Sequence, residues 1–209
     1  MKRYKQSEIE EIATILKNDG VISVPTDTVY GICARINSSK AYNNLVKVKN
    51  RPNNKSFPVL CKDLEQIKSI AILDDNALKL IKAFMPGPLT LVLKKRPEAF
   101  SYINNAGARE TDELEVRMIP SKFLNELIEK VGSPLFLTSA NKSGMDVCRS
   151  LDEIEEECPT LDGMVIGDVS FGEASTIVDL TSDDIKIQRQ GPISEDEIMK
   201  VLKFYNMTI

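Results

Sequence analysis

Helical and strand-like patterns alternate along the whole 209-residue chain, and this alternation limits the folds that it can adopt. No glycine-, serine- or proline-rich linker divides the chain into halves. We therefore expect an α/β (α+β) fold, a single domain over residues 1–209 with a large mixed sheet and flanking helices. Periodicity predicts helices over 9–19, 39–49, 64–69, 75–85, 121–131 and 195–205, and strands over 21–24, 57–61, 89–93, 115–119, 134–138, 164–166, 176–180 and 185–188.

Local signals also mark helix ends and one long loop. A hydroxyl residue followed three positions later by a glutamate predicts a capping box at a helix start. Residues 96–112 show no periodicity and predict a long loop. The three expected capping boxes are Ser7 with Glu10, Ser150 with Glu153, and Ser194 with Glu197.

Composition narrows the chemistry. The chain contains no histidine, which excludes Ser-His and Cys-His catalysis and histidine metal ligands. The four cysteines form no CxxC pair, so we expect reduced thiols in a cytoplasmic protein rather than a disulfide or zinc framework. The net charge of −4 argues against a surface that binds nucleic acid as a whole, but a local basic cavity stays open. No apolar run approaches the roughly 20 residues that span a membrane, and the charged start is no signal peptide.

Two polar segments lie near the amino-terminal end of the expected sheet. The segment PTDTVYG (25–31) follows a strand and is either an ordinary turn or the rim of a site for a polar ligand. Lys49 and Arg51 lie at a helix end, with Lys55 four residues on. These cations either complement the helix dipole or converge on phosphate oxygens.

Two further polar groups lie at the ends of other expected strands. The segment SANKSG (139–144) directly follows a strand, at the edge of an α/β sheet where ligands usually bind. Arg117, Ser175 and Arg189 lie at the ends of three more strands. Neither GxxxxGK[ST] nor GxGxxG is present, so a bound nucleotide would need a less common arrangement.

Taken in order, these segments resemble the YrdC/Sua5 family of threonylcarbamoyl-adenylate synthases. The resemblance spans nearly the whole chain, and it looks like the shorter, YrdC-like form without the additional C-terminal domain of Sua5. Two stretches depart from the family pattern, namely 55–61 and the acidic pair Glu113 and Glu115. The motifs that carry the resemblance are PTDTVYG (25–31), KxR with a later lysine (49–55), PGPLT (86–90), VRMIP (116–120), SANKSG (139–144), STIVDL (175–180) and RQG (189–191).

The resemblance implies a twisted sheet around a concave basic cavity that holds ATP and L-threonine. Positions that match the family's motifs divide between the two substrates, with Lys49 and Arg51 as catalytic residues and no metal ligand from the protein. The expected nucleotide side comprises Lys49, Arg51, Lys55, Ser139, Asn141 and Arg189, and the expected threonine side comprises Thr28, Arg117 and Ser175.

The implied reaction joins the threonine amine to bicarbonate and transfers the carbamate to the α-phosphate of ATP, with release of pyrophosphate. Because bicarbonate, the carbamate and ATP are anions and threonine carries a carboxylate, positioning and electrostatic stabilisation can suffice without a protein nucleophile. Mg²⁺ would be held largely by phosphates and water. The product would pass to a tRNA threonylcarbamoyl transferase complex, with weak RNA binding as an added expectation. We expect Lys49→Ala or Arg51→Ala to abolish pyrophosphate release and to leave the fold intact.

Three alternatives stay open. The first is a binding module for RNA or the ribosome that grips the phosphate backbone in the basic cavity. The second is an enzyme that uses carbamoyl phosphate, like the YrdC-like domain of hydrogenase-maturation carbamoyltransferases. The third is the YciO-like branch of the family, whose members tend to lack the KxR and SxN patterns that this chain has.

Overall fold

The computed structural model describes residues 1–50, 57–99, 112–170 and 172–204. Two of the candidate phosphate-binding residues, Arg51 and Lys55, lie outside this part of the chain, as does most of the loop expected at 96–112.

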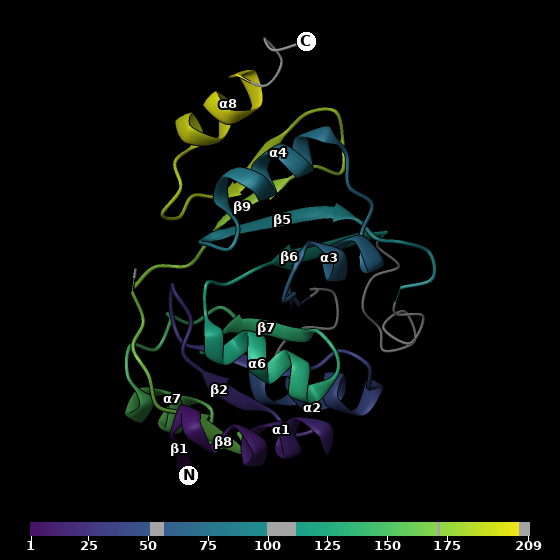
Figure 1. The fold of residues 1–209 in the computed structure, drawn as a ribbon. Coiled ribbons are helices and arrows are strands. Elements are labelled where there is room, and N and C mark those ends of the chain that lie inside the picture. Colours follow the sequence, from purple (N-terminus) through teal and green to yellow (C-terminus); the bar gives the residue numbers. More distant parts are fainter. Residues whose placement is uncertain (51–56, 100–111, 171, 205–209) are drawn as a thin grey trace.

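Among the described residues, a twisted mixed sheet of ten strands forms the centre of the fold (Figure 1). Its strand order is β1-β8-β2-β3-β7-β4-β6-β5-β9-β10, so segments from both ends of the chain lie within it. The pairs β1–β8, β8–β2, β4–β6 and β5–β9 are parallel and the other pairs are antiparallel. The strands are β1 (Arg3–Tyr4), β2 (Ile22–Val24), β3 (Gly31–Arg35), β4 (Val59–Leu60), β5 (Leu89–Lys94), β6 (Glu113–Arg117), β7 (Leu135–Ser139), β8 (Gly163–Val165), β9 (Thr176–Asp179) and β10 (Lys186–Arg189).

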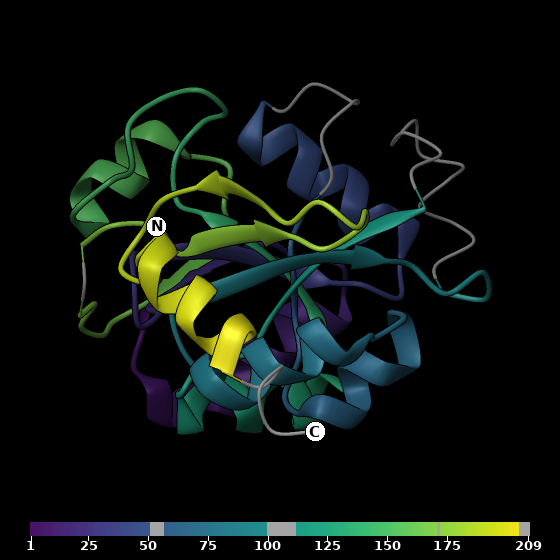
Figure 2. The ribbon, with the colours of Figure 1, turned by 90° about the horizontal axis from the view of Figure 1, so that it is seen from above.

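Helices cover both faces of the sheet, and each face has its own hydrophobic core. On strand β7, Leu135 and Leu137 belong to the core under α1 and α6, whereas Phe136 between them belongs to the other core, because side chains alternate across a strand. Helices α4 and α8 pack together over the β5–β9 end of the sheet (Figures 1 and 2). The helices are α1 (Ile9–Lys17, after a 3-10 turn at Gln6–Glu8), α2 (Ser39–Lys49), α3 (Leu64–Ile70), α4 (Asp75–Phe84), α6 (Lys122–Val131), α7 (Leu151–Glu157) and α8 (Glu195–Phe204).

Two of the three predicted helix caps are confirmed. Ser150 Oγ accepts from the Glu153 N–H (3.2 Å), and Ser194 exchanges hydrogen bonds with Glu197. The box predicted at Ser7 and Glu10 is wrong. The capping box lies two residues earlier, where Glu8 Oε2 accepts from the Lys5 N–H (2.6 Å), and Glu10 instead forms an ion pair with Lys130.

All four cysteines are buried and free. Burial raises the pKa of Cys61 to about 12, and burial with the nearby Glu157 raises the pKa of Cys148 to about 12. Because a cysteine reacts as its thiolate, these thiols serve as packing residues at neutral pH. None of the helices in the described residues is long and apolar enough to cross a membrane.

The inner strand β2 carries a buried hydroxyl, and its removal is expected to stabilise the protein. Ser23 is completely buried, and its Oγ has no hydrogen-bond partner among the described residues. Because an unmet buried donor is unfavourable, Ser23→Ala should raise the free energy of unfolding by about 1 kcal/mol in urea denaturation. The control is Ser133→Ala, whose hydroxyl donates to Pro134 O (3.1 Å), and this change should lower stability instead. A clear loss of stability in Ser23→Ala would contradict the prediction.

Candidate active site

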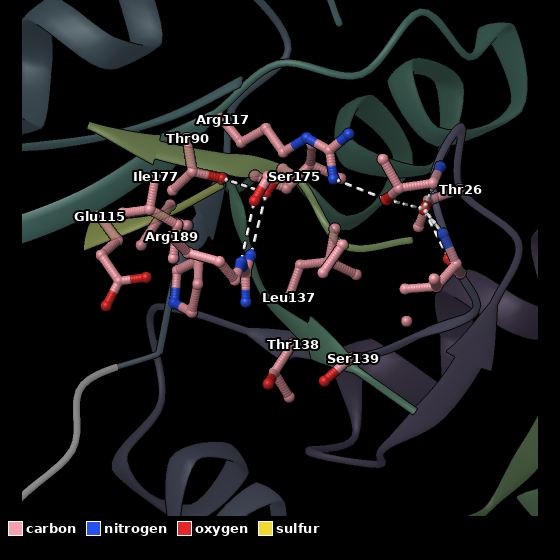
Figure 3. Close-up of a pocket in the computed structure, with 17 residues that line it drawn as sticks. Thr26, Thr90, Glu115, Arg117, Leu137, Thr138, Ser139, Ser175, Ile177 and Arg189 are labelled. Carbon is pink, nitrogen blue, oxygen red and sulfur yellow. Dashed lines mark hydrogen bonds between the residues drawn. The ribbon is translucent and has the colours of Figure 1, made fainter. Parts of the chain in front are cut away.

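A pocket lies where strands from both halves of the sheet meet (Figure 3). Its volume is about 230 Å³. Segments that are far apart in the sequence build it, including the 25–31 loop and the strands β4, β5, β6, β7, β9 and β10. The lining residues are Thr26, Thr28, Val29, Gly31, Pro58, Val59, Leu60, Thr90, Glu115, Arg117, Leu137, Thr138, Ser139, Ala174, Ser175, Ile177 and Arg189.

Strand alternation and register bring the polar side chains to this pocket. On β6, Leu114 and Val116 enter the core, so Glu115 and Arg117 face the opposite side and line the pocket. Thr90 and Arg189 both pair in register with Ile177 of β9, which places β5 and β10 on either side of that residue. Sequence spacing alone does not reveal this register.

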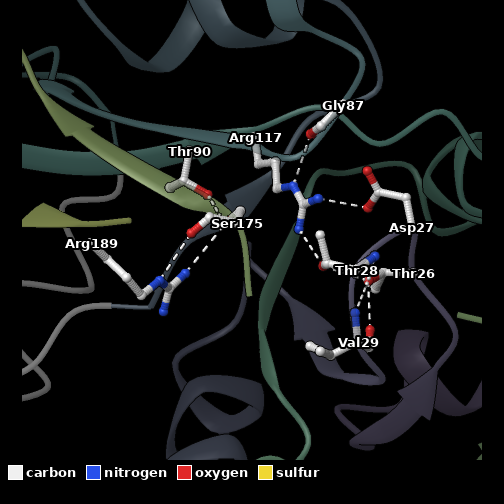
Figure 4. Close-up of polar contacts among 9 residues, drawn as sticks. All are labelled: Thr26, Asp27, Thr28, Val29, Gly87, Thr90, Arg117, Ser175 and Arg189. Carbon is white, nitrogen blue, oxygen red and sulfur yellow. Dashed lines mark hydrogen bonds and ion pairs between the residues drawn. The ribbon is translucent and has the colours of Figure 1, made fainter. Parts of the chain in front are cut away.

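Arg117 is the buried cation at one end of the pocket. Its Nη2 donates to Asp27 Oδ1 (2.6 Å), its Nη1 to Thr28 Oγ1 (3.0 Å) and its Nε to Gly87 O (3.1 Å) (Figure 4). Two of its five N–H groups have no partner among the described residues, so they can bind an anionic ligand. Burial raises the pKa of the Asp27 carboxyl, and the charge of Arg117 opposes this rise.

The loop that holds Thr28 is fixed by a hydroxyl. Thr26 Oγ1 accepts from the N–H groups of Thr28 (3.1 Å) and Val29 (3.3 Å) and donates to Val29 O (2.5 Å). Such local side-chain bonds stabilise a turn without regular structure. The 25–31 segment is therefore a turn and also forms the rim of the pocket, so both interpretations of its sequence hold.

A second polar cluster, at the other side of the pocket, joins β5, β10 and Ser175, the residue before β9. Arg189 Nε donates to Ser175 O (2.9 Å), and its Nη2 donates to Ser175 Oγ (3.3 Å). The hydroxyls of Ser175 and Thr90 lie 2.8 Å apart. In Figures 3 and 4, Ser175 lies between the side chains of Arg189 and Arg117.

Lys49 lies behind the pocket rather than on its surface. Its side chain is 1% exposed, and its Nζ donates to Ser139 O (2.6 Å), Asn141 O and Asn141 Oδ1 (3.2 Å). The hydroxyl of Ser139 also donates to Asn141 Oδ1 (2.6 Å). Lys49 therefore holds the end of β7, where Ser139 lines the pocket, against the loop that follows it.

The structure brings together most of the residues that the sequence singled out. Five line the pocket, Lys49 and Asn141 lie one layer behind it, and Arg51 and Lys55 lie outside the described residues. The described lining carries two arginines and one glutamate, so its positive charge is partly balanced. The five lining residues are Thr28, Ser139, Arg117, Ser175 and Arg189.

Sequence reasoning missed three residues of this site. Asp27 lies within PTDTVYG and Thr90 within PGPLT, but neither motif assigns them a role, and Glu115 is only a departure from the family pattern. Asp27 and Thr90 form hydrogen bonds with expected site residues, and Glu115 lines the same pocket as Arg117. These contacts depend on how the strands pair, which the sequence alone does not reveal. Among the described residues, no group of three or more Asp, Glu, Cys or His side chains could hold a metal ion.

Comparisons with known proteins identify relatives. The Sua5/YciO/YrdC family model, described as telomere recombination, matches residues 14–191. The threonylcarbamoyl-AMP synthase of Yersinia enterocolitica is 30% identical over 181 residues, which cover 82% of this chain and 92% of that protein. The crystal structure of P. abyssi Sua5 complexed with L-threonine aligns with a TM-score of 0.86 at 28% identity, over 96% of this chain and 60% of that one. E. coli YciO aligns with a TM-score of 0.83 at 22% identity, over 94% of this chain and 98% of that one, and shows a shared fold alone.

Proposed function

Since the chain belongs to the Sua5/YciO/YrdC family, we propose that it is a threonylcarbamoyl-AMP synthase that uses L-threonine, bicarbonate and ATP. The observation that carries this proposal is the convergence of Arg117, Arg189 and several hydroxyls on one pocket. The pocket offers hydrogen-bond donors for anions, and no histidine or reactive thiol accompanies them. Arginines and hydroxyls of this kind suit a reaction that needs positioning of the reactants and stabilisation of negative charge.

The amino acid would bind at the Arg117 side of the pocket. Arg117 has N–H groups to spare after its bonds to Asp27, Thr28 and Gly87, and a guanidinium binds a carboxylate through such parallel donors. Ser175 adds a hydroxyl nearby. The pocket volume of about 230 Å³ lies below the roughly 300–1,000 Å³ of drug-sized ligand sites, so it suits an amino acid better than a whole nucleotide.

The nucleotide would bind beside the amino acid, towards Ser139 and Arg189. Arg51 and Lys55 follow α2 in the sequence and are proposed to add charge on the phosphates. Asn141 and Lys49 would support this side through the Ser139 loop. Mg²⁺ would enter with the nucleotide as part of the substrate, because the described residues offer no cluster of ligands for it.

The proposed reaction needs no covalent step on the protein. The threonine ammonium and bicarbonate combine to give a carbamate, water and one released proton. A carbamate oxygen then attacks the α-phosphorus, and the bond to pyrophosphate breaks. The protein would hold both anions in line, and its arginines would stabilise the charge that develops on the phosphoryl oxygens.

The activity would occur in the cytoplasm, and its product would pass to a transferase complex that modifies tRNA. Intact KxR and SxN patterns favour this function over the YciO-like alternative. The small excess of positive charge on the described lining, two arginines against one glutamate, gives little support to phosphate-backbone binding as the primary function.

One assay tests the proposal. Purified protein with ATP, Mg²⁺ and bicarbonate should release pyrophosphate only when L-threonine is added. Parallel reactions with L-serine and with carbamoyl phosphate test the substrate class. Salt-dependent RNA binding without any threonine-dependent use of ATP would contradict the proposal and favour the RNA-binding alternative. Turnover with carbamoyl phosphate in place of bicarbonate would favour the carbamoyltransferase-like alternative.

A further inference from the structure

Thr90 takes no part in the proposed reaction, but its side chain contacts Ser175, which is proposed to bind the amino acid. It lies on β5, is 2% exposed, and its hydroxyl is 2.8 Å from the hydroxyl of Ser175. Ser175 Oγ also accepts from Arg189 Nη2 (3.3 Å). No other hydrogen bond of either hydroxyl is found among the described residues.

A hydroxyl has one donor and two acceptor positions, so the partners of Ser175 can be counted. Arg189 can only donate, and it therefore fills one acceptor position of Ser175 Oγ. If Thr90 donates as well, both acceptor positions are filled and the Ser175 O–H must find its acceptor elsewhere. Ser175 lines the pocket and lies between Arg189 and Arg117 (Figure 4), so its O–H can then point into the pocket.

The opposite direction is less favourable. If Ser175 donated to Thr90, the O–H of Thr90, which also lines the pocket, would be the group left to find an acceptor. An anion in the pocket would then lose the donor that lies between the two arginines. The charge of Arg189 also polarises the Ser175 hydroxyl and makes it a stronger donor.

We propose that Thr90 is a positioning residue that turns the Ser175 O–H towards a carboxylate-type oxygen of the bound amino acid or its carbamate. This inference rests on the proposed function. The two ligand forms share the same oxygen chemistry, and they are separated by measuring L-threonine binding without bicarbonate and then turnover with it. An effect on binding indicates the carboxylate, and an effect on turnover alone indicates the carbamate.

The test compares Thr90→Val, which keeps the shape but removes the hydroxyl, with Thr90→Ser, which keeps the hydroxyl. We expect Thr90→Val to lower kcat/KM for L-threonine about tenfold and Thr90→Ser to stay within about threefold of wild type. Ser175→Ala should show a similar loss. Because Thr90 acts through Ser175, the double variant should be no worse than Ser175→Ala alone.

The controls separate this role from a loss of structure. Urea denaturation should give folded protein for each variant, and KM for ATP should not change. Wild-type kcat/KM in Thr90→Val, or additive losses in the double variant, would overturn the inference. If the wild type releases no threonine-dependent pyrophosphate, the proposed function fails, and L-threonine affinities from calorimetry then decide the inference alone. Absence of binding by the wild type would overturn both.

Discussion

Arg117→Leu is expected to lower the free energy of unfolding by about 3–5 kcal/mol near neutral pH and to eliminate threonine-dependent turnover. The change leaves Asp27 without its ion-pair partner, and the Asp27 side chain is only 9% exposed. The other oxygen of this carboxylate, Oδ2, is already buried without a partner among the described residues. Breaking a buried pair by removing one member leaves an uncompensated charge, which is why the expected loss is large.

The loss in Arg117→Leu should depend on pH in a defined direction. Burial raises the pKa of Asp27, and removal of Arg117 takes away the charge that opposes this rise. An acid whose pKa is higher in the folded than in the unfolded state binds more protons when folded, so stability falls as pH rises through that window. The free energy of unfolding of Arg117→Leu should therefore differ less from that of the wild type at acidic pH, where Asp27 is protonated in both the folded and the unfolded protein. The difference should grow towards neutral pH.

A second substitution distinguishes stability from function. Asp27→Asn combined with Arg117→Leu removes the buried charge and should recover most of the lost stability. Turnover should stay at least about 10²-fold below wild type, because the donor for the substrate anion is still absent. Urea denaturation at pH 5 and pH 7.5, with the pyrophosphate assay, measures both effects.

A matched ion pair outside the pocket serves as the control. Arg35 Nη2 and Asp19 Oδ1 also lie 2.6 Å apart, but Arg35 is 26% exposed and neither residue lines the pocket. Arg35→Leu should therefore destabilise the protein less than Arg117→Leu and should keep turnover. A folded, stable Arg117→Leu protein with wild-type turnover would contradict both the structural and the functional assignment of Arg117.

Much of the fold could be predicted because local signals and tertiary structure agree. Helix α2 has the predicted bounds of 39–49, and Ser38 caps it by accepting from the Ala41 N–H (3.2 Å). Strand β3 was missed. Its residues Ile32 and Cys33 are buried in opposite cores, so no alternation of polar and apolar residues marks it as a strand. Strand β3 also begins at Gly31, inside the turn-like 25–31 segment, so no sequence feature marks its first residue.

The candidate site could be predicted in part. The order of the motifs indicated Thr28, Arg117, Ser139, Ser175 and Arg189, and the structure places all five in one pocket. What the sequence could not reveal is which residues support them. Partners such as Asp27 and Thr90 are set by strand register and loop packing, and these depend on contacts between segments far apart in the chain.

The burial of Lys49 changes the expected outcome of its substitution. The sequence alone led us to expect that Lys49→Ala would abolish activity without affecting the fold. The ammonium group instead donates to oxygens of Ser139 and Asn141 in a site where the side chain is 1% exposed. Hydrogen bonds from a charged donor contribute more than neutral ones, and carbonyls left without a buried donor are unfavourable. Loss of stability is therefore part of the expected result.

Lys49→Met should lower the free energy of unfolding by about 2–4 kcal/mol and reduce kcat/KM for ATP at least about 10²-fold. Methionine fills a similar volume but cannot donate, so the loop from Ser139 to Asn141 should lose its position beside the pocket. Urea denaturation and the pyrophosphate assay at several ATP concentrations measure the two effects.

Two matched variants separate the charge of Lys49 from its place in the loop. Lys47→Met changes an exposed lysine on the same helix and should alter stability by less than about 0.5 kcal/mol. Ser139→Ala keeps the Lys49 contacts to backbone oxygens, so it should lower activity with a much smaller loss of stability. If Lys49→Met were as stable as wild type and inactive, Lys49 would act on the phosphates directly. Stability and activity lost together, with Ser139→Ala losing activity alone, would place its role in holding the loop.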